Sequence, residues 1–261
     1  MGRTTDKGHH SILDRRQALA LALMAGLAPG ARAAEALQLV SADFPALISP
    51  QGPDAPGPLG EFLVQLCALA GWSLQPQFYP FARATQMARS GSRVLMAPLS
   101  RTPAREAQYR WLLPLFAQRY VLMGLRSRWP AGIDTAEARI ATVLALRGTV
   151  GTESLQRQGF QRLAMEGNYA ALLRRIDDGS ADLLYAALPV VTAALRAAGR
   201  DLAHWVQGPS FDQHEVWLVG SADLQPAEVQ ALAAALEKLK RDGGHQRLLQ
   251  RIGAQPPAAA S

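Results

Sequence analysis

The sequence has a single cysteine, Cys67, which lies in an apolar run over residues 62–70. One cysteine excludes an intramolecular disulfide, and its apolar neighbours predict a buried structural thiol. A lipoprotein anchor is also excluded, because that anchor needs a cysteine directly after the apolar stretch near the N-terminus. No uninterrupted apolar run approaches the roughly 18–20 residues of a membrane-spanning helix. We therefore expect the body of the chain to be soluble.

Signatures of catalysis and of metal binding are also missing. Beyond residue 33 the only histidines are His204, His214 and His245, and none is spaced with a partner as in a helical zinc pair. The sequence holds no Gly-x-Ser-x-Gly elbow, P-loop or dinucleotide fingerprint. We expect no metal, no cofactor and no enzymatic activity. If the chain were an enzyme, Glu153 and Asp212 would be its only candidates for a catalytic acid or base.

The overall composition is that of an ordinary globular protein. The chain has 261 residues, of which 49% are hydrophobic and 18% charged. Its formal net charge is +6, but residues 1–33 hold 5 of the 27 basic and 2 of the 21 acidic residues, which leaves +3 on the rest. Because this charge is small and no dense basic run accompanies it, we do not expect nucleic acid to be a partner.

Residues 1–33 have the order of features typical of an export signal. Two adjacent arginines, Arg15 and Arg16, precede an apolar stretch, and small residues ending at Ala33 follow it. We expect cleavage near Ala33 and a periplasmic location. The arginines resemble a twin-arginine signal, but Ala18 replaces its usual large apolar residue, so general secretion stays open. A short amphipathic or core helix is the alternative interpretation.

The rest of the chain alternates between strand and helix patterns, which predicts an α/β fold. A loop rich in Pro and Gly over residues 49–60 precedes a predicted helix over residues 61–70. The predicted strands cover residues 37–40, 94–97, 120–125, 140–144, 183–187 and 215–219.

Two segments 88 positions apart have the same pattern. An aromatic residue followed by Ala lies at residues 81–82 and again at residues 169–170. A Gly-Ser pair lies at residues 91–92 and again at 179–180, and a Leu lies at residue 95 and again at residue 183. Each segment predicts a helix, a Gly-Ser stop and a strand, with small or apolar residues at matching helix positions. We interpret this as one unit built twice, once per lobe. The alternative is that helix–Gly–strand is simply common in α/β proteins.

Three motifs resemble those of the family-3 extracellular solute-binding proteins, which are type II periplasmic binding proteins. In order they are Tyr79-Pro-Phe-Ala-Arg-Ala84, Pro98-Leu-Ser-Arg-Thr-Pro-Ala-Arg-Glu106 and Trp111-Leu-Leu-Pro-Leu-Phe116. The resemblance extends over residues 37–253 and implies two α/β lobes joined by two hinge-crossing strands. The expected boundaries are residues 34–122 plus 213–253 for lobe 1, 123–212 for lobe 2, and 254–261 for a disordered tail. The crossing segments are expected near residues 117–125 and 211–219.

The Thr-Pro-Ala-Arg sequence that ends at Arg105 predicts the start of a helix. Thr102 is a suitable N-cap, and Pro103 fits the first helical position, where a missing N–H costs nothing. Arg105 is unfavourable near a helix N-terminus by about 0.3–1 kcal/mol, which indicates another role for it. In the family the matching arginine holds the ligand carboxylate, so the resemblance implies that role here. The alternative is an exposed arginine paired with Glu106 or Glu61.

Other residues are expected around the same cleft, because ligands of α/β sheets lie beyond the carboxyl ends of the strands. Gly148 before Thr149 allows backbone N–H groups to approach a ligand closely. Aromatic side chains are candidates for an apolar wall, although Phe81 also fits the core and Phe44 a loop. The expected ligand-binding residues are Arg105, Thr102, Ser100, Pro98, Phe44, Tyr79, Phe81, Gly148, Thr149 and Tyr185.

The sequence departs from the family pattern after Asp182, which itself is expected to be structural. Amino acid binders of the family usually place an acid a few positions later to pair with the ligand's ammonium, but none follows before Leu188. A buried ammonium without a counter-charge is costly. A neutral or anionic solute therefore fits better, unless Asp43, Glu153 or Asp212 substitutes.

We therefore expect an exported, monomeric solute-binding protein that closes on a small, carboxylate-bearing solute. Its partner is expected to be the membrane subunits of an ABC-type transporter or a sensor domain. One alternative is an exported enzyme of the same fold, such as a cyclohexadienyl-type dehydratase. The other is the effector lobe of a regulator, although no DNA-binding helix-turn-helix precedes it.

Overall fold

The computed structural model describes residue 2, residues 36–50 and residues 55–258. The predicted signal peptide, its cleavage near Ala33 and the last three residues of the predicted tail lie outside this described part. Among the residues it covers, no helix is both long enough and apolar enough to cross a membrane.

An eight-stranded mixed sheet runs through the described chain in the order β2-β1-β3-β8-β4-β7-β5-β6. The strands are β1 (Gln38–Ser41), β2 (Pro76–Phe78), β3 (Val94–Ser100), β4 (Arg110–Leu125), β5 (Thr142–Leu146), β6 (Arg162–Glu166), β7 (Leu183–Ala187) and β8 (Trp205–Gly220). The helices are α2 (Gly57–Leu69), α3 (Phe81–Ser90), α4 (Thr135–Ile140), α5 (Gly151–Arg157), α6 (Tyr169–Asp177), α7 (Leu188–Ala197), α8 (Pro226–Arg241) and α9 (Gly244–Ile252), with 3₁₀-helices η1 (Pro103–Gln108) and η2 (Leu202–His204).

The two ends of the sheet repeat the same arrangement. At one end β1 lies between β2 and β3, all parallel, and at the other β5 lies between β6 and β7, also parallel. Helix α3 leads into β3 as α6 leads into β7, and Ala84 and Leu172, which are 88 positions apart and so occupy matching places in the two helices, are both buried. The unit predicted from the 88-residue spacing is therefore present twice.

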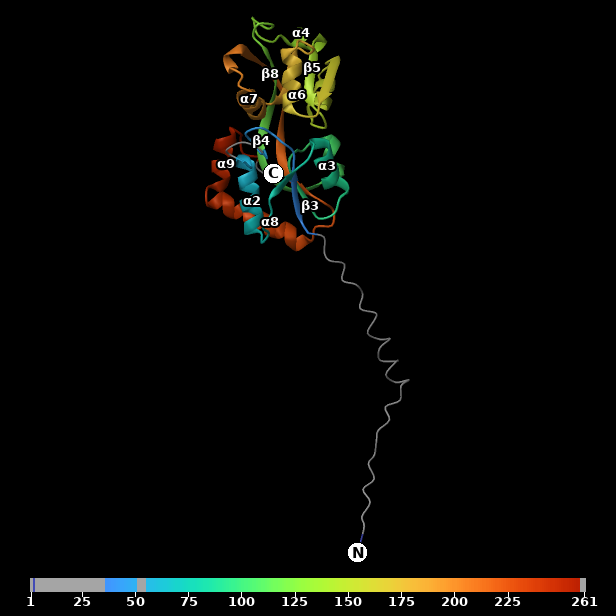
Figure 1. Ribbon diagram of the computed structural model, residues 1–261, viewed down its shortest axis with the longest axis vertical. Helices are drawn as coiled ribbons and strands as arrows, with labels where there is room; N and C mark the ends of the chain where they lie inside the picture. The colour runs from blue at the N-terminus through green and yellow to red at the C-terminus, as the bar shows by residue number, and fades with distance from the viewer. Residues whose placement is uncertain (1, 3–35, 51–54, 259–261) are drawn as a thin grey trace. The chain divides into compact units, whose positions relative to one another are not determined.

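The strands β4 and β8 join the two ends and create the two lobes. They pair antiparallel from Arg110↔Gly220 to Leu125↔Trp205. The β3 strand pairs with β8 only as far as Val216, and β7 pairs with β4 only from Tyr120 onward. Figure 1 shows β3 and α2, α3, α8 and α9 grouped around one part of this ribbon, and β5, α4, α6 and α7 around the other. The predicted two-lobed fold with two crossing strands is confirmed.

Several predicted boundaries are wrong. Both crossing strands are much longer than predicted, because polar residues such as Gln118 and His214 interrupt the apolar pattern while the backbone remains paired. The edge strands β2 and β6 are missing from the prediction, since they lack a buried apolar run. Ile140, predicted to start a strand, ends α4 with its side chain exposed, and β5 begins at Thr142. Helix α2 begins inside the predicted loop, at Gly57.

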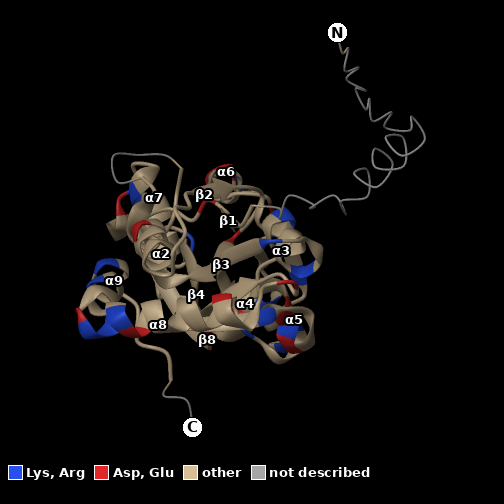
Figure 2. Cartoon of the chain, turned by 90° about the horizontal axis from the view of Figure 1, so that it is seen from below, with Lys and Arg blue, Asp and Glu red and all other residues tan. Residues whose placement is uncertain are grey.

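The core consists of apolar side chains between the sheet and the helices. Helix α2 packs against α8 and α9, and its Cys67 is buried, as predicted. Loss of hydration raises the pKa of the Cys67 thiol to about 12. Basic and acidic segments lie close together on α5 (Figure 2).

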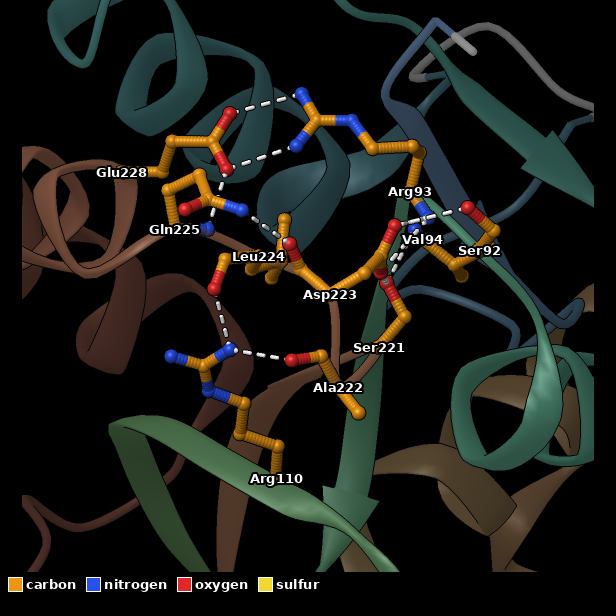
Figure 3. A network of polar contacts seen from close by, with 10 residues as sticks. All are labelled: Ser92, Arg93, Val94, Arg110, Ser221, Ala222, Asp223, Leu224, Gln225 and Glu228. Atoms are coloured by element: carbon orange, nitrogen blue, oxygen red, sulfur yellow. Dashed lines mark hydrogen bonds and ion pairs between the residues drawn. The ribbon is translucent and has the colours of Figure 1, made fainter. Parts of the chain in front are cut away.

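A polar network fastens the start of β3 to the loop that follows β8 (Figure 3). The Arg93 guanidinium donates two hydrogen bonds of 2.8 Å to Glu228, and the Arg93 N–H donates to Asp223. The hydroxyl of Ser221 donates to the same Asp223 carboxylate and is the main reason that its pKa falls to about 2. Glu228 also accepts from the N–H of Gln225, which closes a capping box at the start of α8.

The predicted disordered tail is wrong for residues 254–258. The Ala117 N–H donates to the Gln255 carbonyl oxygen at 2.8 Å, and the Gln255 N–H donates back at 3.1 Å. The N–H of Ala258 donates to the carboxylate of Glu215 at 2.9 Å. This segment therefore lies across β4 and β8 at the point where β3 and β7 do not reach.

Candidate functional site

A cavity lies between the two lobes, with β4 on its floor. Its lining residues are Phe44, Leu47, Phe81, Pro98, Ser100, Arg105, Gln118, Tyr120, Leu146, Thr149, Val150, Tyr169, Tyr185, Ala186, Ala187 and Val190. Its volume is about 20 Å³, which is roughly the space that one water molecule needs.

Arg105 is the charged residue among those that line the cavity. It lies on η1, two residues after Pro103, and only 7% of its surface is exposed. Its Nη2 donates to the Gly148 carbonyl oxygen of the other lobe at 2.7 Å. No carboxylate among the described residues forms an ion pair with it, since the alternative partners Glu106 and Glu61 pair with other arginines. The cavity therefore contains a buried cation that lacks a counter-charge.

The local structure around Thr102 differs from the prediction. A helix does begin at Pro103, but η1 is a six-residue 3₁₀-helix, and Thr102 makes no side-chain cap. The Thr102 hydroxyl is buried without a hydrogen-bond partner, and the residue does not line the cavity. The η1 helix is therefore too short for its N-terminus to act as an anion site. The Arg105 guanidinium is the remaining group in this segment that could bind an anion.

The opposite wall is a tight turn between β5 and α5. Gly148 has φ +80°, a conformation that glycine adopts without strain, and its carbonyl oxygen faces Arg105. The N–H of Thr149, predicted to approach a ligand, instead donates to the Leu146 carbonyl oxygen at 3.1 Å, and its hydroxyl donates to the same oxygen. The N–H and the hydroxyl of Thr149 therefore have their hydrogen-bond partner within the turn. Gly148 does not line the cavity.

The aromatic wall is partly as predicted. Phe44 and Phe81 line the cavity and pack edge to face, with ring centroids 5.4 Å apart. Tyr79 does not line it: its hydroxyl donates to Gln77 on the same side of the chain, and Arg83 lies over its ring.

Tyrosines from β4 and from the second lobe complete the polar lining. The hydroxyl of Tyr120 lies 3.3 Å from Ser100 Oγ and accepts from Gln118 Nε2 at 3.4 Å. The Tyr185 hydroxyl donates to Asp212 at 2.9 Å. Burial raises the pKa of both phenols, so they stay protonated at neutral pH.

The acids that could have paired with an ammonium lie elsewhere. Asp182 accepts from the Thr142 N–H at 2.7 Å and pairs with Arg128, which gives it a structural role. Asp43 is exposed, and Asp212 is engaged by Tyr185. The residues that line the cavity include no Asp or Glu.

Seven of the ten predicted residues line the cavity: Phe44, Phe81, Pro98, Ser100, Arg105, Thr149 and Tyr185. Their role in ligand binding stays a prediction. The prediction missed Tyr169, although it occupies the position of Phe81 in the second copy of the repeat. It also missed Gln118 and Tyr120, which lie on the predicted crossing segment.

The described residues contain no group of three His, Cys, Asp or Glu side chains that could hold a metal ion. His245 lies away from the cavity lining and contacts the Leu115 carbonyl oxygen at 2.6 Å. His214 packs edge to face on Tyr120, and its pKa is lowered chiefly by burial.

No protein-family model matches the chain, and no curated protein matches it. Solved structures do match the chain. The chain is similar to an ABC uptake transporter substrate binding protein from Streptococcus pneumoniae with bound histidine, at 14% identity and a TM-score of 0.71, over 86% of this chain and 95% of that one. It is also similar to a histidine kinase sensor domain with similarity to periplasmic binding proteins, at 17% identity and a TM-score of 0.73, over 85% and 98% of the two chains.

A third similar structure is an ancestral amino acid-binding protein, a precursor of cyclohexadienyl dehydratase, at 13% identity and a TM-score of 0.71, over 83% of this chain and 95% of that one. These likenesses confirm the predicted resemblance to type II periplasmic binding proteins as a likeness of fold.

Proposed function

We propose that the chain is an exported solute-binding protein that holds a small, carboxylate-bearing solute between its lobes without changing it chemically. The observation that carries the proposal is Arg105, a buried guanidinium in the cavity with no carboxylate partner among the described residues. A buried cation is costly until an anion joins it. The planar guanidinium matches a carboxylate in two parallel hydrogen bonds.

The hinge in this proposal is the part of β4 and β8 that neither β3 nor β7 covers. It divides the chain into the predicted lobes, residues 34–122 plus 213–253 and residues 123–212. The hydrogen bond from Arg105 to Gly148 links the lobes. A ligand at the remaining guanidinium N–H groups would stabilise a closed form whose lobes lie farther apart than in this structure, because the cavity here has room for about one water molecule. A transporter's membrane subunits or a sensor would then recognise that form, and similar folds occur in proteins of both kinds.

We infer that the chain is not an enzyme. Acid–base chemistry needs a group in the cavity whose pKa lies near the working pH. The residues that line the cavity include no Asp, Glu, His, Cys or Lys, and the Tyr120 and Tyr185 hydroxyls have raised pKa values. The test incubates the protein at high concentration with prephenate, and formation of a dehydrated product would contradict the inference.

The binding test uses residues 34–261, a panel of small monocarboxylates, and isothermal titration calorimetry. We expect Arg105→Ala to weaken binding of any carboxylate by about 30-fold or more, as loss of a buried charged hydrogen-bond partner does. The matched control is Arg83→Ala, which removes an exposed arginine that lies over the Tyr79 ring and does not line the cavity. Unchanged binding in Arg105→Ala would overturn the carboxylate role.

Two further measurements test the remaining parts of the proposal. The mass of the ligand released from periplasmic protein by mild unfolding identifies the solute. Fractionation of cells that express the full chain tests export and cleavage near Ala33. Recovery of uncleaved protein from the cytoplasm would contradict both.

A further inference from the structure

Gln118 is an unusual residue for the floor of the cavity. Only 8% of its surface is exposed, and its amide oxygen has no hydrogen-bond partner. Its Nε2 donates to the Tyr120 hydroxyl at 3.4 Å, and Tyr120 in turn lies 3.3 Å from Ser100 Oγ. A buried polar atom without a partner costs about 1–3 kcal/mol, so such atoms are normally satisfied by a protein group, a water molecule or a ligand.

The surroundings of Gln118 determine what kind of group could join it. It pairs across the strands with His214, whose Nε2 is also buried without a partner. Gln118, Tyr120 and Ser100 all line the same cavity as Arg105. Unpartnered polar atoms therefore lie next to a cavity whose lining charge is positive.

The two orientations of the Gln118 amide lead to the same ligand group. In either orientation one end of the amide contacts Tyr120 and the other end has no partner. A hydroxyl both donates and accepts, so it satisfies the amide in either orientation. An ammonium only donates, and it would sit near Arg105 with no carboxylate in the lining. The chemistry therefore favours a hydroxyl over an ammonium.

We propose that Gln118 is a specificity-determining residue that selects a hydroxycarboxylate with an apolar body over the corresponding amino acid. Arg105 binds the carboxylate, the Gln118 amide binds the hydroxyl, and the aromatic wall of Phe44, Phe81 and Tyr169 contacts the apolar body. This inference rests on the proposed function, because it names the solute class for the same cavity.

The experiment compares two matched series of acids that differ at one substituent. The first is 3-phenyllactate, phenylalanine and 3-phenylpropionate, and the second is 2-hydroxyisocaproate, leucine and 4-methylpentanoate. For the unmodified protein we expect each hydroxy acid to bind about 10-fold more tightly than its deoxy analogue, as one hydrogen bond allows. The amino acid should bind more weakly than both.

Variants at Gln118 give the decisive result. In Gln118→Met the advantage of the hydroxy acid over the deoxy acid should fall below about 3-fold, because the amide is gone. Gln118→Glu adds a carboxylate of similar size and should raise the affinity for leucine relative to 2-hydroxyisocaproate. The melting temperature of each variant without ligand reports whether it folds, and Arg83→Ala is again the control.

The outcomes separate this inference from the proposed function. Equal binding of leucine and 2-hydroxyisocaproate, or an unchanged hydroxy-to-deoxy ratio in Gln118→Met, would overturn the role of Gln118 while Arg105-dependent binding of the acids remained. Absence of binding for every acid in both series would overturn both proposals.

Discussion

Replacing Arg105 by methionine should stabilise the protein in the absence of a ligand. An unpaired buried charge costs about 3–5 kcal/mol, and Arg105 is 7% exposed with no carboxylate partner among the described residues. Its hydrogen bond to the Gly148 carbonyl oxygen returns about 1.5–3 kcal/mol. Methionine has a similar length and no charge, so Arg105→Met should raise the free energy of unfolding by up to about 3.5 kcal/mol.

For a chain of this size that change corresponds to a rise in Tm of up to about 10 °C, which differential scanning calorimetry of residues 34–261 measures. The matched variant is Arg101→Met. Arg101 pairs with Glu106 and stacks 4.4 Å from the centre of the Trp217 ring, so its removal should not raise the Tm. A bound carboxylate at 100 times its Kd should add about 2.7 kcal/mol to the unmodified protein, and the same concentration should add less than about 1 kcal/mol to Arg105→Met.

A lower Tm for Arg105→Met without ligand would refute this reasoning. Arg105 would then serve chiefly to hold the lobes together through Gly148, and the cost of its buried charge would already be offset within the protein.

Two further predictions concern parts of the chain outside the cavity. The Cys67 thiol, whose pKa is raised to about 12 by burial, should not react with a thiol reagent at pH 8 until denaturant unfolds the protein; rapid reaction of the native protein would contradict its burial. Asp223 has a pKa of about 2, below its ordinary value, so its stabilising effect is present above about pH 4 and is lost as the pH falls through about 2. The urea midpoint of Asp223→Asn should therefore be lower than that of the unmodified protein at pH 7 and equal to it near pH 2, whereas a constant difference would contradict the role of this carboxylate.

Local sequence patterns predicted two kinds of element. These are strands that are buried on both faces and helices whose apolar residues recur along one face. The strand β7 was predicted with its observed bounds, because all five of its residues are buried and apolar. The 88-residue repeat predicted the correspondence of α3 with α6, since a helix, a glycine stop and a strand are each encoded within a few residues. The edge strands and the full lengths of β4 and β8 could not be predicted, because their pairing is set by neighbours distant in sequence.

The sequence by itself determined the alternation of elements, the burial of Cys67 and the start of η1 at Pro103, because propensity, periodicity and the missing N–H of proline act within one or two turns of chain. Only the tertiary structure decided which polar groups have partners. It places Glu106 and Glu61 against other arginines, and it leaves Arg105 and Gln118 in one cavity. Charge and hydrogen-bond satisfaction depend on atoms brought together from distant segments, and no local pattern encodes them.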